Sequence, residues 1–363
     1  MSRLIKLIPI VLVVLLSACQ SKPQEQEQQQ QEQPQEPPKR VATSFWEIVN
    51  PYYADHEGYT IIHAEGKTRH CIPITGWYGG YDDDYHHLHH HGVAVESELM
   101  AYRIYFDEKQ TIDVYCKRTP RLELAQSYWY PNDSLLAEHY GDDILRVGGT
   151  VGVGTVKYWN GKLCHIENVG ERQQWIQYQS ADTAIISVGD IDWEVPDGKQ
   201  NSPSTRTMAC LHADYTMCAG HRDMRCEVRV TTPLKGLCTG VQCIPAKNPA
   251  PDSDKAVIVL PNGILLASWG TDWPVNDTVK YAKETVGLGV FIPKAFAGKP
   301  VHDNSNNLCL LKVQSHEDEE TSVIDYQAHF YLTCVGATKE DHPVATNATE
   351  WYDYLRQWAE GLQ

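Results

Sequence analysis

Residues 86–117, HHLHHHGVAVESELMAYRIYFDEKQTIDVYCK, carry the clearest β-strand pattern of the chain. Val93 to Phe106 is rich in Val, Tyr, Ile and Phe and contains neither Gly nor Pro, which predicts one long strand. Thr111 to Lys117 predicts a second strand. Because strand side chains alternate between the two faces of a sheet, the sequence assigns a face to each residue of both strands.

One face of the first predicted strand carries acidic side chains. Alternation places Glu96, Glu98 and Tyr102 together and puts Arg103 on the opposite face. An unpaired buried carboxylate is costly, so two acids on one face predict either a solvated surface or a polar cleft. We expect a cleft in which Glu96 and Glu98 serve catalysis, with ordinary surface acids as the alternative.

The second predicted strand carries a polar stripe. Asp113, Tyr115 and Lys117 alternate onto one face of this strand. Together they offer an acid, a phenol and an amine that a sugar hydroxyl or carboxylate would meet. We therefore predict that these three residues bind substrate.

The histidine run at residues 86–91 suggests metal binding at first sight. Adjacent histidines of one loop seldom reach a single ion, however, because natural sites draw their ligands from several elements. We predict no metal ligands here, and calcium at the YDDDY run, residues 81–85, is the one cofactor left open. His91, which precedes Gly92 at the start of the strand, is expected to be functional.

The N-terminus predicts export. Residues 1–18 combine a basic start with a short apolar run and read as a signal peptide. Leu16-Ser17-Ala18-Cys19 resembles a bacterial lipobox, which implies lipid attachment at Cys19; a plain signal peptide with an incidental cysteine is the alternative. Residues 19–40 are rich in Gln, Glu and Pro and predict a disordered tether. Gln20 favours the outer membrane, on its periplasmic or cell-surface side.

Residues 41–363 are expected to form a single domain. Many short strand patterns with few helical ones predict a mainly β fold, an antiparallel β-sandwich. One helix is predicted at the C-terminus, where Asn347 and Glu350 form a variant capping box and Trp351 opens an apolar stripe. A second helical turn is predicted at Ser134 to Tyr140.

Composition excludes several classes of function. A net charge of −16 without a basic cluster argues against nucleic acid. The glycine-rich residues 147–154 lack the spacing of a nucleotide-binding loop, and no Gly-x-Ser-x-Gly or His-Glu-x-x-His motif indicates an esterase or zinc protease. Ten cysteines besides Cys19 predict some disulfides in an exported protein, and the absence of a CxxC pair argues against structural zinc.

His221 and Arg222 precede another alternating strand pattern. An arginine forks onto carboxylates, so this pair is a candidate site for an anionic sugar. A structural role in a turn is the alternative.

Five segments carry a resemblance to a known family: residues 90–107, 113–117, 129–131, 140–143 and 147–154. Together they resemble the domain-of-unknown-function family 4861. The resemblance covers most of the mature chain and departs from the family pattern at Cys116, where glycine is expected. It implies an exported protein of polysaccharide-degrading bacteria with a galactose-mutarotase-like β-supersandwich.

These observations predict a lipid-anchored, carbohydrate-active enzyme that acts on uronate-containing poly- or oligosaccharides by β-elimination or glycoside hydrolysis. Tyr102 and His91 are the predicted acid/base pair, and the further catalytic candidates are Glu96, Glu98 and His221. The substrate-binding candidates are Arg103, Asp113, Tyr115, Lys117 and Arg222. A non-catalytic glycan-binding lipoprotein of a polysaccharide-utilisation system and a sugar epimerase are the alternatives.

Overall fold

A computed structural model of the chain describes residues 42–45, 60–64, 67–72, 89–127, 129–198, 206–245, 254–318 and 324–362. All of these belong to the compact unit Lys39–Gln363. The predicted signal peptide, the lipidated Cys19 and the tether lie outside the described residues, as do the possible calcium ligands at residues 81–85.

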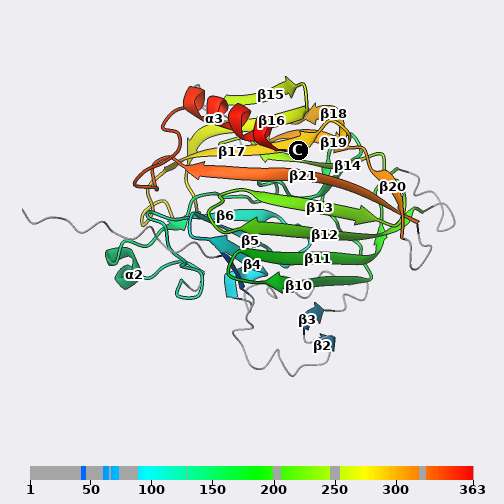
Figure 1. The fold of residues 1–363 in the computed structure, drawn as a ribbon, viewed down its shortest axis with the longest axis horizontal. Helices are drawn as coiled ribbons and strands as arrows, with labels where there is room; N and C mark the ends of the chain where they lie inside the picture. Colours follow the sequence, from blue (N-terminus) through cyan, green and yellow to red (C-terminus); the bar gives the residue numbers. More distant parts are fainter. Residues whose placement is uncertain are drawn as a thin grey trace, which may run out of the picture. The chain divides into compact units, whose positions relative to one another are not determined.

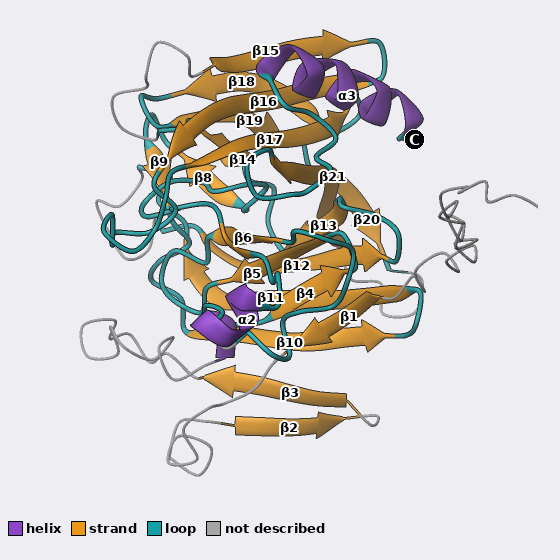
Figure 2. Cartoon of the chain, turned by 90° about the vertical axis from the view of Figure 1, so that its left-hand side faces the viewer, coloured by secondary structure: helices purple, strands orange, loops and turns teal. Residues whose placement is uncertain are grey.

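The described residues form three antiparallel sheets and confirm a mainly β fold (Figures 1 and 2). The small sheet has the order β1-β4-β5-β6-β7, and its strands are β1 (Ala42–Phe45), β4 (Ala94–Ser97), β5 (Met100–Ile104), β6 (Ile112–Cys116) and β7 (Asp142–Asp143). The third sheet, with the order β18-β19-β14-β8-β9, comprises β8 (Lys157–Trp159), β9 (Leu163–Cys164), β14 (Leu237–Gln242), β18 (Ala297–His302) and β19 (Asn306–Leu311).

The large sheet has 11 strands and runs in the order β15-β16-β17-β21-β13-β12-β11-β10-β3-β2, with β20 paired to β21. Its strands are β2 (Thr60–Ala64), β3 (Lys67–Ile72), β10 (Glu171–Gln179), β11 (Thr183–Glu194), β12 (Met208–Cys218), β13 (Met224–Val230), β15 (Asp254–Leu260), β16 (Gly263–Asp272), β17 (Glu284–Pro293), β20 (Gln314–Glu317) and β21 (Ile324–Gly336). Burial alternates along β12, as expected for a strand with one face on the core.

The prediction of one long strand from Val93 to Phe106 is wrong, because this segment forms a β-hairpin. Strand β4 ends at Ser97 and β5 begins at Met100, so Glu98 and Leu99 form the turn. Ser97 Oγ accepts a hydrogen bond from Leu99 N at 3.0 Å, a local bond typical of turns. The turn reverses the chain, so the residues of β5 point to the opposite faces from those that a continuous strand would give them.

The hairpin register changes which side chains share a face. Glu96 lies opposite Ala101, and Val95 lies opposite Tyr102. Because directly opposed residues point to the same side of a sheet, Glu96 shares its face with Arg103 and not with Tyr102. The predicted grouping of Glu96, Glu98 and Tyr102 on one face is therefore wrong.

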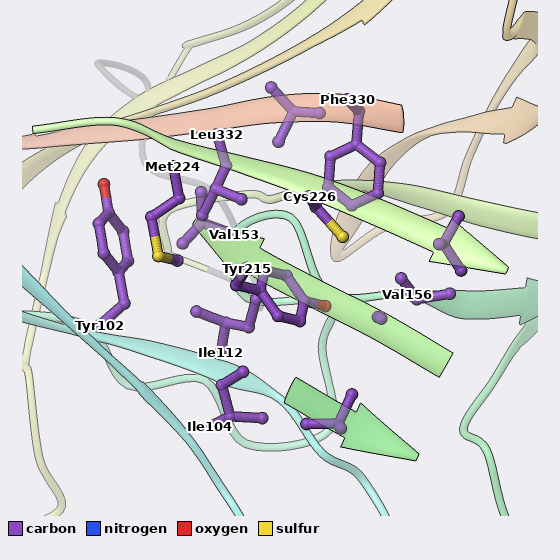
Figure 3. Packing of buried hydrophobic residues seen from close by; sticks show 14 of the residues in the cluster. Tyr102, Ile104, Ile112, Val153, Val156, Tyr215, Met224, Cys226, Phe330 and Leu332 are labelled. Carbon is purple, nitrogen blue, oxygen red and sulfur yellow. The ribbon is translucent and has the colours of Figure 1, made fainter. Parts of the chain in front are cut away.

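The apolar face of the small sheet packs on the large sheet. Tyr102, Ile104 and Ile112 belong to one buried cluster with Met224 of β13 and Leu332 of β21 (Figure 3). Fully buried aliphatic and aromatic side chains stabilise the fold by roughly 1.5–3 kcal/mol each. This face therefore holds the small sheet in place, and its other face is left for polar side chains. The galactose-mutarotase-like supersandwich remains a prediction.

The C-terminal helix α3 (Ala348–Gly361) is confirmed. Asn347 caps it by accepting a hydrogen bond from Glu350 N at 3.1 Å, and Trp351, Leu355 and Ala359 are its buried residues. Trp351 packs over Gly287 of β17, where a Cβ atom would lie 2.8 Å from the indole. A short helix, α2 (Asp133–Ala137), with Asn132 as its N-cap, confirms the second predicted helical turn in a shorter form.

Eight of the described cysteines are free thiols, so the expectation of disulfides is not met at these positions: Cys116, Cys164, Cys210, Cys218, Cys226, Cys238, Cys309 and Cys334. Among the described residues, no helix is long and apolar enough to cross a membrane.

Candidate functional site

Arg103 is the centre of the polar face of the small sheet. Its guanidinium Nη2 donates to Asp113 Oδ2 at 2.5 Å and to Asp143 Oδ2 at 2.7 Å, and its Nη1 donates to Trp129 O at 2.7 Å. The register explains this cluster, since Arg103 lies opposite Asp113, and Tyr115 lies opposite Asp143. One nearly fully buried cation thus holds two carboxyl groups from neighbouring strands.

The two carboxyl groups compete for ionisation. Burial raises the pKa of Asp143 well above its ordinary value; the neighbouring Asp113 raises it further, and Arg103 opposes both effects. Burial also raises the pKa of Asp113, against the lowering effects of Arg103 and of the hydrogen bond from Val114 N. Two adjacent buried carboxyls beside one cation disfavour the ionisation of both, and the rise in pKa is the larger at Asp143.

Lys117 organises a second buried ion cluster. Its Nζ donates to the carboxylate of Glu96, to Ser97 O and, at 2.7 Å, to Arg121 O. Glu96 also accepts hydrogen bonds from the backbone N–H groups of Glu123 at 2.9 Å and Leu124 at 3.1 Å. The ammonium of Lys117 and both carboxylate oxygens of Glu96 therefore have hydrogen-bond partners. Because several of these partners belong to the loop after β6, the cluster fixes this loop against the sheet.

His91 lies in an aromatic stack beside Arg103 and its carboxyl partners. Its ring stacks on Tyr105 with centroids 5.3 Å apart and on Trp129 with centroids 4.9 Å apart. The following Gly92 has φ +153°, and a Cβ there would lie 2.0 Å from Ile104 O, so only glycine fits. The stack builds a wall of the site, and Trp129 links it to Arg103 through its carbonyl.

A cleft of about 270 Å³ opens over this network. Tyr105, Tyr130 and Asp143 line it, together with the cations Lys109 and Arg146. Residues 274–276 of the loop between β16 and β17 also line the cleft. Aromatic faces, a carboxyl and cations in one cleft suit a sugar that carries a carboxylate.

The tyrosines of the cleft stay protonated at neutral pH. Burial raises the pKa of Tyr105 well above its ordinary value, and the carboxylate of Asp113 adds to this rise. Burial also raises the pKa of Tyr130, whose ring meets Tyr281 edge-on with centroids 6.3 Å apart. At this site the phenols therefore act as hydrogen-bond donors.

The structure does not bring the predicted acid/base pair together. Tyr102 lies in the core, where its hydroxyl donates to Arg222 O at 2.5 Å and burial raises its pKa well above the ordinary value. His91 stacks instead on Tyr105, on the face that carries Arg103. The tyrosine beside His91 in the structure is therefore Tyr105.

The predicted catalytic residues Glu98 and His221 and the predicted substrate-binding residue Arg222 are not among the residues that line the cleft. Glu98, in the hairpin turn, accepts a hydrogen bond from Gly220 N at 3.0 Å. His221 is exposed and lies 3.2 Å from Asp223. Arg222 is buried and pairs with Glu340 at 3.0 Å, so its guanidinium is already occupied by a carboxylate. These contacts indicate that Glu98, His221 and Arg222 have structural roles.

The polar stripe of the second strand is confirmed, but its members are buried. Asp113, Tyr115 and Lys117 share the face of Arg103 and are at most 2% exposed. They support the cleft from below and do not line it. Cys116 points to the opposite face, where Gly336 packs against its sulfur.

Sequence reasoning missed Tyr130, Asp143, Arg146 and the loop at residues 274–276. Asp143 lies in the Tyr140–Asp143 motif, and Tyr105 alternates onto the face of Arg103, so both signals were present in the sequence. Within the described ranges, no group of three or more His, Cys, Asp or Glu side chains is arranged to hold a metal ion.

These features define a mainly antiparallel β domain whose small sheet carries a buried ion network beneath a tyrosine-lined cleft with both carboxyl and cationic side chains. The chain belongs to the family described as "Domain of unknown function (DUF4861)", whose model matches residues 20–363. A search of curated proteins finds no match.

Proposed function

We propose that the protein is a carbohydrate-active enzyme that cleaves glycosidic bonds of uronate-containing oligosaccharides in the cleft of Tyr105, Tyr130 and Asp143. The observation that carries the proposal is the carboxyl of Asp143, which lines the cleft and whose pKa burial and Asp113 raise well above the ordinary value. A carboxylic acid whose pKa is raised in this way is suited to act as a general acid.

Each group of the cleft has a role in this proposal. Asp143 protonates the leaving glycosidic oxygen, and Arg103 holds it in place through the 2.7 Å contact. Asp107 is the second carboxyl of the lining and serves as the base or nucleophile. Tyr105 and Tyr130 stack on the sugar and donate hydrogen bonds to its hydroxyls.

Arg146 is the proposed partner of the uronate carboxylate. Its side chain is exposed at the cleft and contacts Asp272 at 3.3 Å and Asn276 at 3.4 Å. Exposed ion pairs of this length contribute roughly 0–1 kcal/mol, so a ligand carboxylate replaces Asp272 at little cost.

The test is a product assay with oligogalacturonates and glucuronate oligosaccharides. New reducing ends without absorbance of an unsaturated product indicate hydrolysis, and both signals together indicate β-elimination. Asp143→Asn is expected to lower the initial rate at least 100-fold, the usual range of a general acid. Tyr102→Phe, in the core, is expected to keep the wild-type rate. Absence of product from every uronate oligosaccharide would refute the enzyme proposal.

A non-catalytic glycan-binding role is the second candidate, favoured by Tyr130 of the cleft lining, whose ring meets Tyr281 edge-on. Aromatic side chains of this kind bind sugar rings without chemistry. Saturable binding of an oligogalacturonate that is lost in Tyr130→Ala, with no turnover in the wild type, would establish this role in place of the enzyme.

The proposal includes a location, which rests on the sequence of residues 1–40. The signal peptide and a lipid on Cys19 would place the domain at the outer membrane, where exported polysaccharides are met. Cys19→Ser is expected to move the protein from the membrane fraction to the soluble fraction; unchanged fractionation would contradict the anchor.

A further inference from the structure

Lys157 of β8 is a fully buried amine with an unusual set of partners. Its Nζ donates to Lys109 O and, at 3.2 Å, to Thr111 Oγ1, and it lies 2.9 Å from His165 Nδ1. All three partners are neutral acceptors. A buried ammonium is therefore held here by hydrogen bonds without an opposing charge.

The other fully buried cations of the described residues have carboxylate partners. Arg103 contacts Asp113 and Asp143, Lys117 contacts Glu96, and Arg172 contacts Asp190. No Asp or Glu among the described residues lies within ion-pair distance of Lys157. Because an unpaired buried charge is costly, this amine needs either an anion nearby or the loss of its proton.

Lys157 lies directly behind a wall of the cleft. Two of its partners, Lys109 and Thr111, are cleft-lining residues, whereas His165 lines a separate cavity of about 340 Å³. Burial and the positive charge of Lys157 lower the pKa of His165 to about 3, so this ring is a neutral acceptor. The positive charge of Lys157 therefore makes the electrostatic potential of the cleft most positive beside Lys109 and Thr111.

The charged groups around Lys157 compensate its positive charge only in part. Lys109 and Arg172 are cations, and Cys238 is a buried thiol whose pKa is raised by burial. Asp107 is the acid that faces it, and Asp107 Oδ1 already accepts from Lys109 N at 2.9 Å and Gln110 N at 2.8 Å.

We propose that Lys157 is the buried half of an anion subsite at Thr111 and Lys109, which receives a second carboxylate of an oligouronate bound in the cleft, in addition to the carboxylate assigned to Arg146. The inference rests on the proposed function for the identity of that ligand, a uronate. It assigns Lys157 as a positioning residue, since the amine attracts the carboxylate through the Thr111 and Lys109 wall and does not contact it.

The subsite couples binding to proton uptake. Burial lowers the pKa of Lys157 to about 7, against the raising effect of Asp107, so part of the free protein carries a neutral amine at neutral pH. An anion at the wall favours the ammonium form and raises this pKa. A rise of one pH unit corresponds to about tenfold tighter binding of the anion to the charged form.

The experiment follows the Lys157 Nζ titration by NMR of the full chain labelled at lysine side chains. The signal is assigned by its absence in Lys157→Met and, should that variant fail to fold, in Lys157→Arg. The probes are sodium acetate, galacturonate and galactose. We expect the titration midpoint to rise by about one pH unit with saturating acetate or galacturonate and to stay unchanged with galactose.

A midpoint that neither acetate nor galacturonate raises overturns the subsite. The product assay with Asp143→Asn judges the proposed function separately. Turnover of an oligogalacturonate without a rise at Lys157 refutes the subsite alone, and a rise with acetate without turnover of any uronate oligosaccharide supports the subsite and refutes the enzyme. As a control, Lys162→Met at the exposed surface leaves the Lys157 titration unchanged.

Discussion

The pair Asp113 and Asp143 is expected to share one negative charge, and this gives a sharp prediction for their amide variants. Asp113→Asn or Asp143→Asn alone removes a proton-sharing partner and leaves one carboxylate on Arg103, whose contacts with the two acids are 2.5 and 2.7 Å. Each single variant loses about one hydrogen bond, about 1 kcal/mol. The double variant leaves a buried guanidinium unpaired, which costs about 3–5 kcal/mol.

The two substitutions are therefore expected to be strongly non-additive. The sum of the single costs is about 2 kcal/mol, so the coupling energy is about 1–3 kcal/mol. The assay is urea unfolding of the full chain at pH 5, followed by tryptophan fluorescence. Asp272→Asn, at the exposed pair with Arg146, is the control and is expected to change stability by less than about 0.5 kcal/mol.

The same variants test how the free energy of unfolding depends on pH. Because the folded-state pKa of Asp143 is raised above the ordinary value of 3.8, the folded protein binds more protons than the unfolded chain at pH values between the two pKa values. This group therefore lowers the free energy of unfolding by up to about 1.4 kcal/mol for each pH unit above the unfolded-state value, until the folded-state pKa is reached. Asp143→Asn removes this slope, so its cost shrinks as pH rises. Additive costs, or single variants that each lose 3 kcal/mol or more, would refute the shared charge.

Three further variants test the fold around the site. Lys117→Met leaves Glu96 buried without its cation and is expected to cost about 3–5 kcal/mol in urea unfolding, whereas a loss below about 1 kcal/mol would contradict the ion pair. Asn347→Ala removes the cap of α3 and costs about 1 kcal/mol, and Asn347→Asp, which keeps the acceptor, restores stability; equal losses in both would argue against the cap. Trp351→Ala creates a cavity over β17 worth about 3–5 kcal/mol in thermal unfolding, and an unchanged midpoint would contradict its burial.

Local sequence patterns predicted the periodicity within single segments but not the point at which the chain reverses. The stripe of Asp113, Tyr115 and Lys117 and the helix after Asn347 follow from periodicity within one segment, and the structure confirms them. The hairpin at Glu98 and Leu99 contains no Gly, Pro or Asn, so no turn residue marked it, and one unrecognised turn inverted the assignment of Tyr102.

The cleft depends on contacts between segments that are distant in sequence. Asp143 of β7 reaches Arg103 of β5 across the one intervening strand β6, and residues 274–276 come from a loop of the large sheet. A single sequence carries no signal for such pairings. Burial also excludes Tyr102 and Arg222 from the catalytic and binding roles that their side-chain types suggest. The Tyr102 hydroxyl contacts Cys334, and the Arg222 guanidinium pairs with Glu340.

The central claim is that the protonated carboxyl of Asp143 cleaves uronate-containing sugars, and the ratio of initial rates of Asp143→Asn and wild type on one oligogalacturonate tests it most directly. The claim predicts a wild-type rate that falls as pH rises through the folded-state pKa of Asp143, and a variant rate at least 100-fold lower below that pKa. Equal rates in a variant that folds like the wild type would contradict it.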